Sequence, residues 1–271
     1  MCNASIKKRS FMNKEKVDLE KRDSVRSVER AIEILQTFSF EHSSLSLAQI
    51  CRETDLPKTT VFRLLITLEE NGFLAIDSET GCYHLGYEAI KIGAIAQESN
   101  DIAKIAKDEM NWISEQTEAT CNLYIRDGYE RLCIAQVAGS QYVRRYSFLG
   151  ARHPLYCGAG KLLLAYADKE FQEEYLKNVK LEKFTEHTVT NPQILREELE
   201  SIRTAGYSVT LGERDASTAM VAVPLIDFRG KAIAGITVSG PVYCFSDENI
   251  ALYIQKLKAA AGRISLKLGC K

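Results

Sequence analysis

The stretch L-P-K-T-T-V-F-R-L-L-I-T-L-E-E-N-G-F-L, residues 56–74, decides the fold of the first third of this 271-residue chain. Its apolar positions recur three or four residues apart, which predicts a helix with one buried face. Pro57 suits the first helical position, because its missing N–H would have no intrahelical partner there, and Asn71-Gly72 suits the end. The predicted helix covers about 57–70, and its buried positions are Val61, Leu64, Leu65 and Leu68.

The residues on either side of this helix predict a small domain of three helices and a hairpin. Upstream, residues 24–40 carry apolar residues at helical spacing, and Ser46 is placed to cap a second helix over 47–54. Downstream, β-like runs at 73–76 and 82–85 are separated by the turn sequence Asp-Ser-Glu-Thr-Gly. Three helices, the second and third joined by a tight turn, followed by a hairpin, make a winged helix-turn-helix.

Four polar residues remain on the exposed side of the third predicted helix once its buried face is subtracted. In a helix-turn-helix, the N-terminal residues of this helix reach base edges and phosphates in the major groove. Lysine and arginine contact guanine or phosphate, and threonine hydrogen-bonds phosphate. A simple solvated face is the competing interpretation. With the cap residue of the second helix, the expected contacts to double-stranded operator DNA are Ser46, Lys58, Thr59, Thr60 and Arg63.

Charge is unevenly distributed along the chain, although the formal net charge is only −1. Residues 1–30 carry nine Lys and Arg against five Asp and Glu, whereas residues 31–86 carry three against eight. Residues 1–23 are polar and lack a sustained apolar period, which predicts a mobile basic arm. DNA contacts are therefore expected from individually placed residues and the arm rather than from a uniformly basic domain.

The remainder of the chain predicts a linker helix over 87–100 and a larger mixed domain over 101–271. Turn sequences at 126–128 and 228–230 favour antiparallel pairing of the strands around them. The fold class is therefore α+β, with an antiparallel sheet and flanking helices after a winged helix-turn-helix over 24–86. Helices are expected over 101–116, 160–167, 192–205 and 247–268, and strands over 120–125, 132–137, 220–226 and 232–238.

Composition excludes several other classes of protein. No apolar run approaches the roughly 18 residues that span a membrane, and the basic run at 7–9 is not followed by the apolar segment of a secretory signal. A cytoplasmic location without a membrane partner is therefore expected. The eight cysteines form no C-x-x-C pair, so we interpret them as reduced thiols, with a redox or metal site as the alternative. Neither a metal nor a cofactor is expected.

Eight motifs, taken in order, resemble the IclR family of transcriptional regulators. The resemblance covers nearly everything after the arm, although Phe62 stands where the family usually has tyrosine, so a hydroxyl contact to phosphate is lost. It implies that 101–271 form a GAF-like effector-binding and oligomerisation domain, which assembles the chain with itself as a dimer or a dimer of dimers. The motifs are S-V-E-R-A-I-E-I-L (27–35), L-S-L-A-Q-I-C (45–51), the stretch over 56–74, Y-H-L-G (83–86), H-P-L-Y-C-G-A-G-K-L-L-L-A (153–165), A-G-Y (205–207), V-A-V-P-L-I-D (221–227) and I-T-V-S-G-P (236–241).

The resemblance also places a small-molecule pocket beside G-A-G at 158–160, where a helix N-terminus would present backbone N–H groups to an anion. Clustered arginines just before this segment favour an anionic effector, a small organic or aromatic carboxylate, with a surface role as the alternative. Ser217 and Met220 replace residues that are usually smaller, which predicts a narrower or more apolar pocket. The expected effector-binding residues are Arg144, Arg152, Gly158, Ala159, Glu213, Met220, Thr237 and Ser239.

Two other functions remain as alternatives to an effector-controlled regulator. An enzyme that uses its winged helix only for dimerisation would need a cofactor motif such as G-x-G-x-x-G after a strand, and the sequence has none. His153 and Cys157, four residues apart in an expected turn, show no catalytic geometry. A regulator without a ligand would use the large domain for assembly alone. We expect a DNA-binding regulator with no enzymatic activity.

Overall fold

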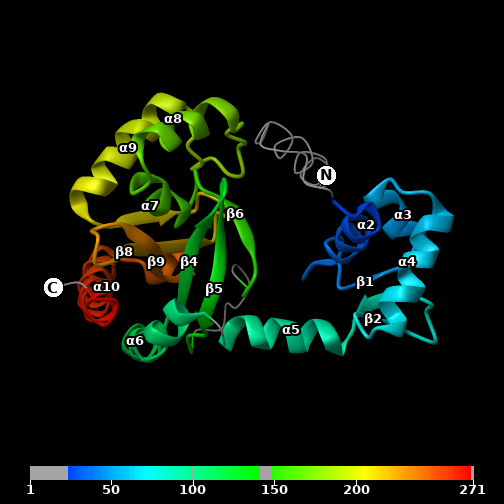
Figure 1. Ribbon diagram of the computed structural model, residues 1–271. Coiled ribbons are helices and arrows are strands. Elements are labelled where there is room, and N and C mark those ends of the chain that lie inside the picture. The colour runs from blue at the N-terminus through cyan, green and yellow to red at the C-terminus, as the bar shows by residue number, and fades with distance from the viewer. Residues whose placement is uncertain (1–23, 99, 141–147, 270–271) are drawn as a thin grey trace. The chain divides into compact units, whose positions relative to one another are not determined.

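The computed structural model describes residues 24–98, 100–140 and 148–269 (Figure 1). The chain divides into two compact units, Met1–Ala96 and Gln97–Lys271. The predicted arm over 1–23 lies outside the described residues. Within the described residues, no helix is both long enough and apolar enough to cross a bilayer.

The first unit has the winged helix-turn-helix order of elements that the sequence predicts. Its three short strands form an antiparallel sheet in the order β1-β3-β2, in which β1 is an addition too short for a pattern to reveal. The third helix begins at Lys58, one residue later than predicted, because Pro57 has an extended ψ of 137° and serves as the N-cap. The elements are α2 (Arg26–Leu35), β1 (Ser44–Leu45), α3 (Leu47–Thr54), α4 (Lys58–Glu70), β2 (Leu74–Ile76), β3 (Tyr83–Leu85) and α5 (Tyr87–Glu98).

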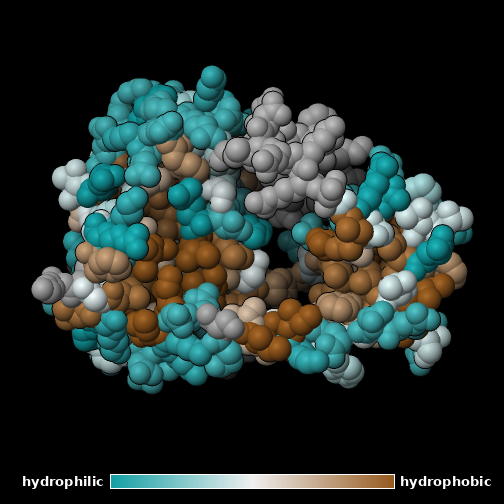
Figure 2. Space-filling model, viewed as in Figure 1, coloured by the Kyte–Doolittle hydropathy of each residue, from teal (hydrophilic) through white to brown (hydrophobic). Residues whose placement is uncertain are grey.

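Helix α2 is shorter than the predicted 24–40, and its apolar face is only partly buried. Ile34 is fully buried in the core of this unit, but Val28 is 54% exposed and Ile32 is 48% exposed. Figure 2 shows hydrophobic side chains at the surface of this helix. An apolar groove of about 490 Å³ lies between α2 and α4; it is lined by Ser27, Val28, Ala31, Ile32, Leu35, Leu64, Thr67, Leu68 and Phe73.

The second unit is built on a six-stranded antiparallel sheet in the order β6-β5-β4-β9-β8-β7. The two turn sequences recognised at 126–128 and 228–230 join β4 to β5 and β8 to β9, so both predicted hairpins are present. The short edge strands β6 and β7 were not predicted. The strands are β4 (Thr120–Asp127), β5 (Glu130–Val137), β6 (Arg152–Pro154), β7 (Ser208–Leu211), β8 (Thr218–Ile226) and β9 (Ala232–Pro241).

Helices cover both faces of this sheet (Figure 1). Helices α6 (Asp101–Thr117) and α10 (Asp247–Lys267) pack on one face, and α7 (Gly160–Ala165) packs on the other together with α9 (Pro192–Ala205). An unpredicted helix, α8 (Lys169–Asn178), follows α7, which ends two residues earlier than expected.

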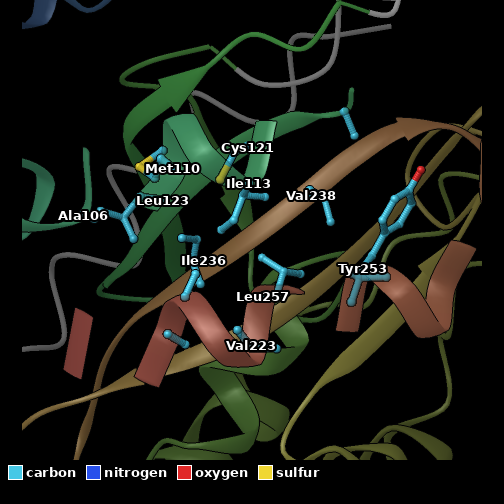
Figure 3. Packing of buried hydrophobic residues seen from close by; sticks show 14 of the residues in the cluster. Ala106, Met110, Ile113, Cys121, Leu123, Val223, Ile236, Val238, Tyr253 and Leu257 are labelled. Atoms are coloured by element: carbon cyan, nitrogen blue, oxygen red, sulfur yellow. The ribbon is translucent and has the colours of Figure 1, made fainter. Parts of the chain in front are cut away.

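The larger apolar core lies between the sheet and the α6–α10 pair (Figure 3). Because successive strand residues point to opposite faces, Cys121 and Leu123 point into this core while Asn122 and Tyr124 point towards α7. The same alternation runs through β8 and β9. The inward side chains that Figure 3 labels are Ala106, Met110, Ile113, Cys121, Leu123, Val223, Ile236, Val238, Tyr253 and Leu257.

The six described cysteines are all free thiols. Cys121, Cys133 and Cys157 are buried, and burial raises the pKa of the Cys133 thiol to about 12. A thiol with so high a pKa stays protonated at neutral pH and behaves as a small apolar side chain. Among the residues described, no three His, Cys, Asp or Glu side chains are grouped so that they could hold a metal ion.

Candidate functional site

Helix α4 presents a polar, partly basic face above its buried stripe. Lys58, Thr59 and Arg63 are exposed and Thr60 is half-buried, whereas Val61, Leu65 and Leu68 lie in the core of the first unit. Phe62 is 47% exposed beside these polar residues, so an apolar ring occupies part of the same surface. The structure thus brings four of the five predicted DNA contacts together on one helix.

Ser46, the fifth predicted contact, is engaged in its own helix. Its backbone N–H donates to Oε1 of Gln49 at 2.8 Å, and its Oγ accepts from the N–H of Gln49 at 3.4 Å. This reciprocal arrangement is a capping box, and it satisfies backbone groups at the start of α3. The Ser46 side chain therefore has a structural partner, and a DNA contact from it stays a prediction.

The wing between β2 and β3 is acidic at its tip. Asp77 accepts hydrogen bonds from the backbone N–H groups of Glu79 and Thr80, at 2.9 and 2.8 Å. These hydrogen bonds hold the pKa of the Asp77 carboxyl below its usual value. Residues 71–86 contain neither Lys nor Arg, so this wing offers DNA no basic side chain, whereas α4 offers Lys58 and Arg63.

The 158–160 turn at the start of α7 is closed by intramolecular contacts, contrary to the expectation of exposed N–H groups. Gly158, with a φ of +57°, donates its N–H to Oε2 of Glu213 at 2.9 Å, and Ala159 donates to the Met220 sulfur at 2.9 Å. Gly160 is required by packing, because a Cβ there would lie 2.6 Å from the Cα of Leu155. Four of the predicted residues thus meet at this turn, where Gly158 contacts Glu213 and Ala159 contacts Met220.

A buried ion pair lies directly beneath this turn. The ammonium of Lys161 pairs with Glu213 and also with Glu198, whose Oε2 lies 2.8 Å from Nζ. The Lys161 side chain is 4% exposed and that of Glu213 is 9% exposed. Burial acts to lower the pKa of Lys161, but the charge of Glu213 and the hydrogen bonds to both carboxylates outweigh it and raise the pKa. Lys161 therefore remains charged at neutral pH.

Thr237 and Ser239 lie on the face of the sheet that is turned towards α7. Ser239 is the strand partner of both Thr120 and Met220, and its hydroxyl accepts from the amide of Asn122 at 3.0 Å. The side-chain oxygen of Asn122 accepts in turn from Gln136 at 2.7 Å. This face thus carries a polar row that includes one residue, Asn122, which is fully buried and which sequence reasoning missed.

Arg131 is the second residue that sequence reasoning missed on this face. It occupies β5 opposite His153 and is only 1% exposed. Its Nη1 donates to the carbonyl oxygen of Cys157, next to Gly158. The period-2 pattern over 130–137 holds the signal, because Arg131 shares its face with the buried Cys133.

The structure does not bring Arg152 to the same face. Arg152 pairs across the strands with Leu132, one position away from the pair of Arg131 and His153, so its side chain points to the other side of the sheet. There it forms ion pairs with Asp127 and, at 3.9 Å, with Glu130. The predicted contact from Arg144 lies outside the described residues.

Two family descriptions match the chain. "IclR helix-turn-helix domain" matches residues 27–78, and "Bacterial transcriptional regulator IclR C-terminal" matches residues 94–266. The two matches lie one in each compact unit apart from residues 94–96, and together they cover most of the described chain.

Three related proteins illustrate the similarity. The HTH-type transcriptional regulator KipR of Bacillus subtilis is 32% identical over 90% of this chain and 97% of its own length. The crystal structure of the Thermotoga maritima IclR is 34% identical with a TM-score of 0.73, covering 90% of this chain and 98% of that one. An IclR homologue from Microbacterium hydrocarbonoxydans, crystallised with 4-hydroxybenzoate, has a TM-score of 0.77 at 23% identity and covers 90% and 99%.

Proposed function

This chain belongs to the IclR family of bacterial transcriptional regulators, and from that premise we propose that it recognises a specific operator through α4 and that a small organic acid controls this recognition. Family membership shows that the chain is a DNA-binding transcriptional regulator. It does not support the alternative of an enzyme that uses its winged helix only for dimerisation. The observation that carries the finer proposal is the exposed face of α4, where Lys58, Thr59 and Arg63 stand clear of the buried stripe. Placed in the major groove, these side chains reach phosphates and base edges.

The effector site is proposed on the sheet face beneath α7. Gly158, Ala159, Met220 and Glu213 meet there, and Thr237 and Ser239 continue the same face with hydroxyl groups. Apolar walls with a few convergent polar groups are typical of small-molecule sites. An aromatic carboxylate such as 4-hydroxybenzoate is a reasonable first probe, because the Microbacterium relative was crystallised with it.

We infer that the effector controls DNA binding through the arrangement of two copies of the chain. We infer a dimer, or a dimer of dimers, in which the acid favours one spacing of the two α4 helices. Half-sites about 34 Å apart, or a multiple of it, fit a two-fold dimer. Exposed apolar side chains support self-association: in α5, Tyr87 is 87% exposed and Ile90 is 66% exposed, and the groove between α2 and α4 is also apolar (Figure 2).

The domain limits of 24–86, 87–100 and 101–271, with an N-terminal arm over 1–23, are proposed as the working parts of this regulator. In this division α5 is the linker that transmits the effector signal. We propose that the protein is located in the cytoplasm, because the operator DNA that it binds is there.

A mobility-shift assay on the DNA upstream of the gene tests the proposal. Arg63→Ala is expected to weaken binding and to reduce the dependence of affinity on salt, because it removes a phosphate or base contact. Lys177→Ala, an exposed lysine of α8 in the other unit, is the matched control and is expected to bind as the parent does. Equal binding by both variants would rule out α4 as the reading element.

A second arm of the assay addresses effector control. The carboxylate probe is added to the parent protein and to Arg63→Ala, and its own binding is followed by thermal shift. We expect equal stabilisation of the two proteins by the acid, and a change in operator affinity of the parent. Loss of acid binding in Arg63→Ala would contradict the division into a reading unit and a sensing unit.

A further inference from the structure

Arg131 is a buried cation to which the described part of the chain offers no carboxylate. It is 1% exposed, and no Asp or Glu among the described residues forms an ion pair with its guanidinium. Its Nε–H has no hydrogen-bond partner among these residues either, although Nη1 donates to the Cys157 carbonyl. A buried charge costs folding free energy unless it is paired. Arg131 thus retains unused capacity to bind an anion.

The guanidinium lies on the side of Gly158 where any other residue would carry its side chain. A Cβ at position 158 would stand 3.0 Å from Nη1 of Arg131, 3.2 Å from Nη2 and 3.2 Å from the sulfur of Met220. The arginine also lies over the Tyr124 ring, with its central carbon 5.2 Å from the ring centroid. Arg131, Gly158 and Met220 therefore meet at one point of the sheet face where the effector site is proposed.

The nearby carboxylates are already engaged elsewhere. Glu213 and Glu198 both pair with the ammonium of Lys161, and Glu213 also accepts from the Gly158 N–H. By contrast, the Ala159 N–H donates to a thioether sulfur, which is a weak acceptor. The Arg131 guanidinium is thus a strong donor, and the Ala159 N–H is a backbone donor with a weak acceptor. Only Gly158 and the flexible Met220 side chain lie between them.

We propose that Arg131 receives the carboxylate of the effector, an inference that rests on the proposed effector site and names the chemistry that it recognises. The planar guanidinium offers Nε–H and an Nη–H to the two oxygens of a carboxylate, the bidentate geometry that arginine prefers. The acid displaces the Met220 sulfur, so that the Ala159 N–H gains an oxygen acceptor. Arg131 takes the part that sequence reasoning gave to Arg152, which faces the other way.

A purely structural role for Arg131 makes a different prediction for its variants. If the arginine served only to hold the Cys157 carbonyl, its replacement by an apolar side chain of similar length would lower the melting temperature. A binding role adds to this contact, because the Nε–H without a partner stays available to a carboxylate, so acid binding by the folded Arg131→Met is lost as well. The acid affinity of the folded variant therefore separates the two roles.

The experiment uses the full chain and the variants Arg131→Met and Arg131→Lys, with Arg152→Met as the matched control on the opposite side of the sheet. Acetate, succinate, benzoate and 4-hydroxybenzoate are tested by thermal shift and calorimetry, and 4-hydroxybenzamide serves as the neutral counterpart of the last. We expect the acid but not the amide to bind the parent and Arg152→Met. Loss of the bidentate contact should weaken acid binding by Arg131→Met at least about tenfold, and Arg131→Lys should retain part of it.

The outcomes distinguish this inference from the function on which it rests. Equal acid binding by the parent and Arg131→Met overturns the role of Arg131 and leaves the effector site standing. If Arg131→Met does not fold, equal acid binding by the parent and Arg131→Lys overturns the inference in the same way. Binding of the amide as tightly as the acid rules out recognition of a carboxylate. If no acid binds the parent while operator binding is intact, the effector proposal itself fails.

Discussion

Lys161 in the first turn of α7 and Glu213 in the loop after β7 form an ion pair that is almost completely shielded from solvent. The pair ties the 158–160 turn to the opposite edge of the sheet, since Glu213 also holds the Gly158 N–H. In a buried ion pair, the attraction between the two charges offsets the cost of removing them from water only while both members are present. The same pair therefore supports the candidate effector site and makes it sensitive to substitution.

Lys161→Met is expected to destabilise the protein by about 3–5 kcal/mol, because it leaves the buried Glu213 carboxyl, whose pKa burial already raises, without its cation. Adding Glu213→Gln in the same chain should recover part of this loss. Lys169→Met provides the control: Lys169 and Glu200 form an exposed pair at 3.2 Å, worth about 0–1 kcal/mol. Urea unfolding of the four proteins gives the comparison, and a double variant no more stable than Lys161→Met would contradict the pairing.

Gly158→Ala tests the crowding around Arg131. The left-handed backbone at this position costs an alanine about 1–2 kcal/mol, and the new Cβ would also press on Arg131 and Met220. Gly128→Ala isolates the first effect, because Gly128 has a φ of +59° but nothing within 4 Å of an added Cβ. Thermal unfolding should show a larger loss of stability for Gly158→Ala than for Gly128→Ala. Equal losses would mean that Arg131 and Met220 move aside at no cost.

Ser46→Ala separates a structural role of this serine from a DNA contact. Loss of the capping box is expected to cost about 1 kcal/mol of stability. Ser46→Asp restores a cap but adds a negative charge near DNA. If Ser46 also lies against the phosphate backbone, as the sequence predicts, Ser46→Asp will unfold like the parent and bind the operator more weakly. If Ser46→Asp binds the operator as tightly as the parent does, the only role of Ser46 is to cap α3.

Acid is expected to loosen the wing. Because the pKa of Asp77 is lowered in the folded state, its hydrogen bonds stabilise the turn above the usual aspartate value of about 3.9 and are lost as the pH falls below it. NMR shifts of the Glu79 and Thr80 amide protons should therefore titrate below pH 4. Asp77→Asn retains the acceptor without the charge, and a transition with the same midpoint in that variant would exclude Asp77 as its source.

Sequence patterns located most of the regular structure because the local signals agree. Asn191 caps α9, Pro192 begins it and Gly206 ends it in a left-handed conformation, so its predicted limits match the structure. The edge strand β6 has three residues, too few for a periodic pattern, and the highly charged α8 carries a weak apolar stripe.

The candidate effector site was harder to predict, because it depends on strand register. Arg131 and Arg152 lie 21 positions apart in the sequence, and only the pairing of β5 with β6 reveals that they point to opposite sides of the sheet. Proximity in sequence favoured Arg152, which lies close to the 158–160 turn. Asn122 gave no signal either, because single polar residues are common in strands. Its importance becomes visible only when its hydrogen-bond partners are known.

The central strands β4 and β9 have a further consequence for how the protein is made. Thr120 pairs with Ser239, so the middle of the second sheet joins segments that are synthesised far apart in time. The first unit relies on contacts within its own residues and can fold while the chain is still on the ribosome. The sensing unit cannot complete its sheet until β8 and β9 have been synthesised. Until then β4 and β5 expose apolar side chains, and in this interval the nascent chain would depend most on chaperones.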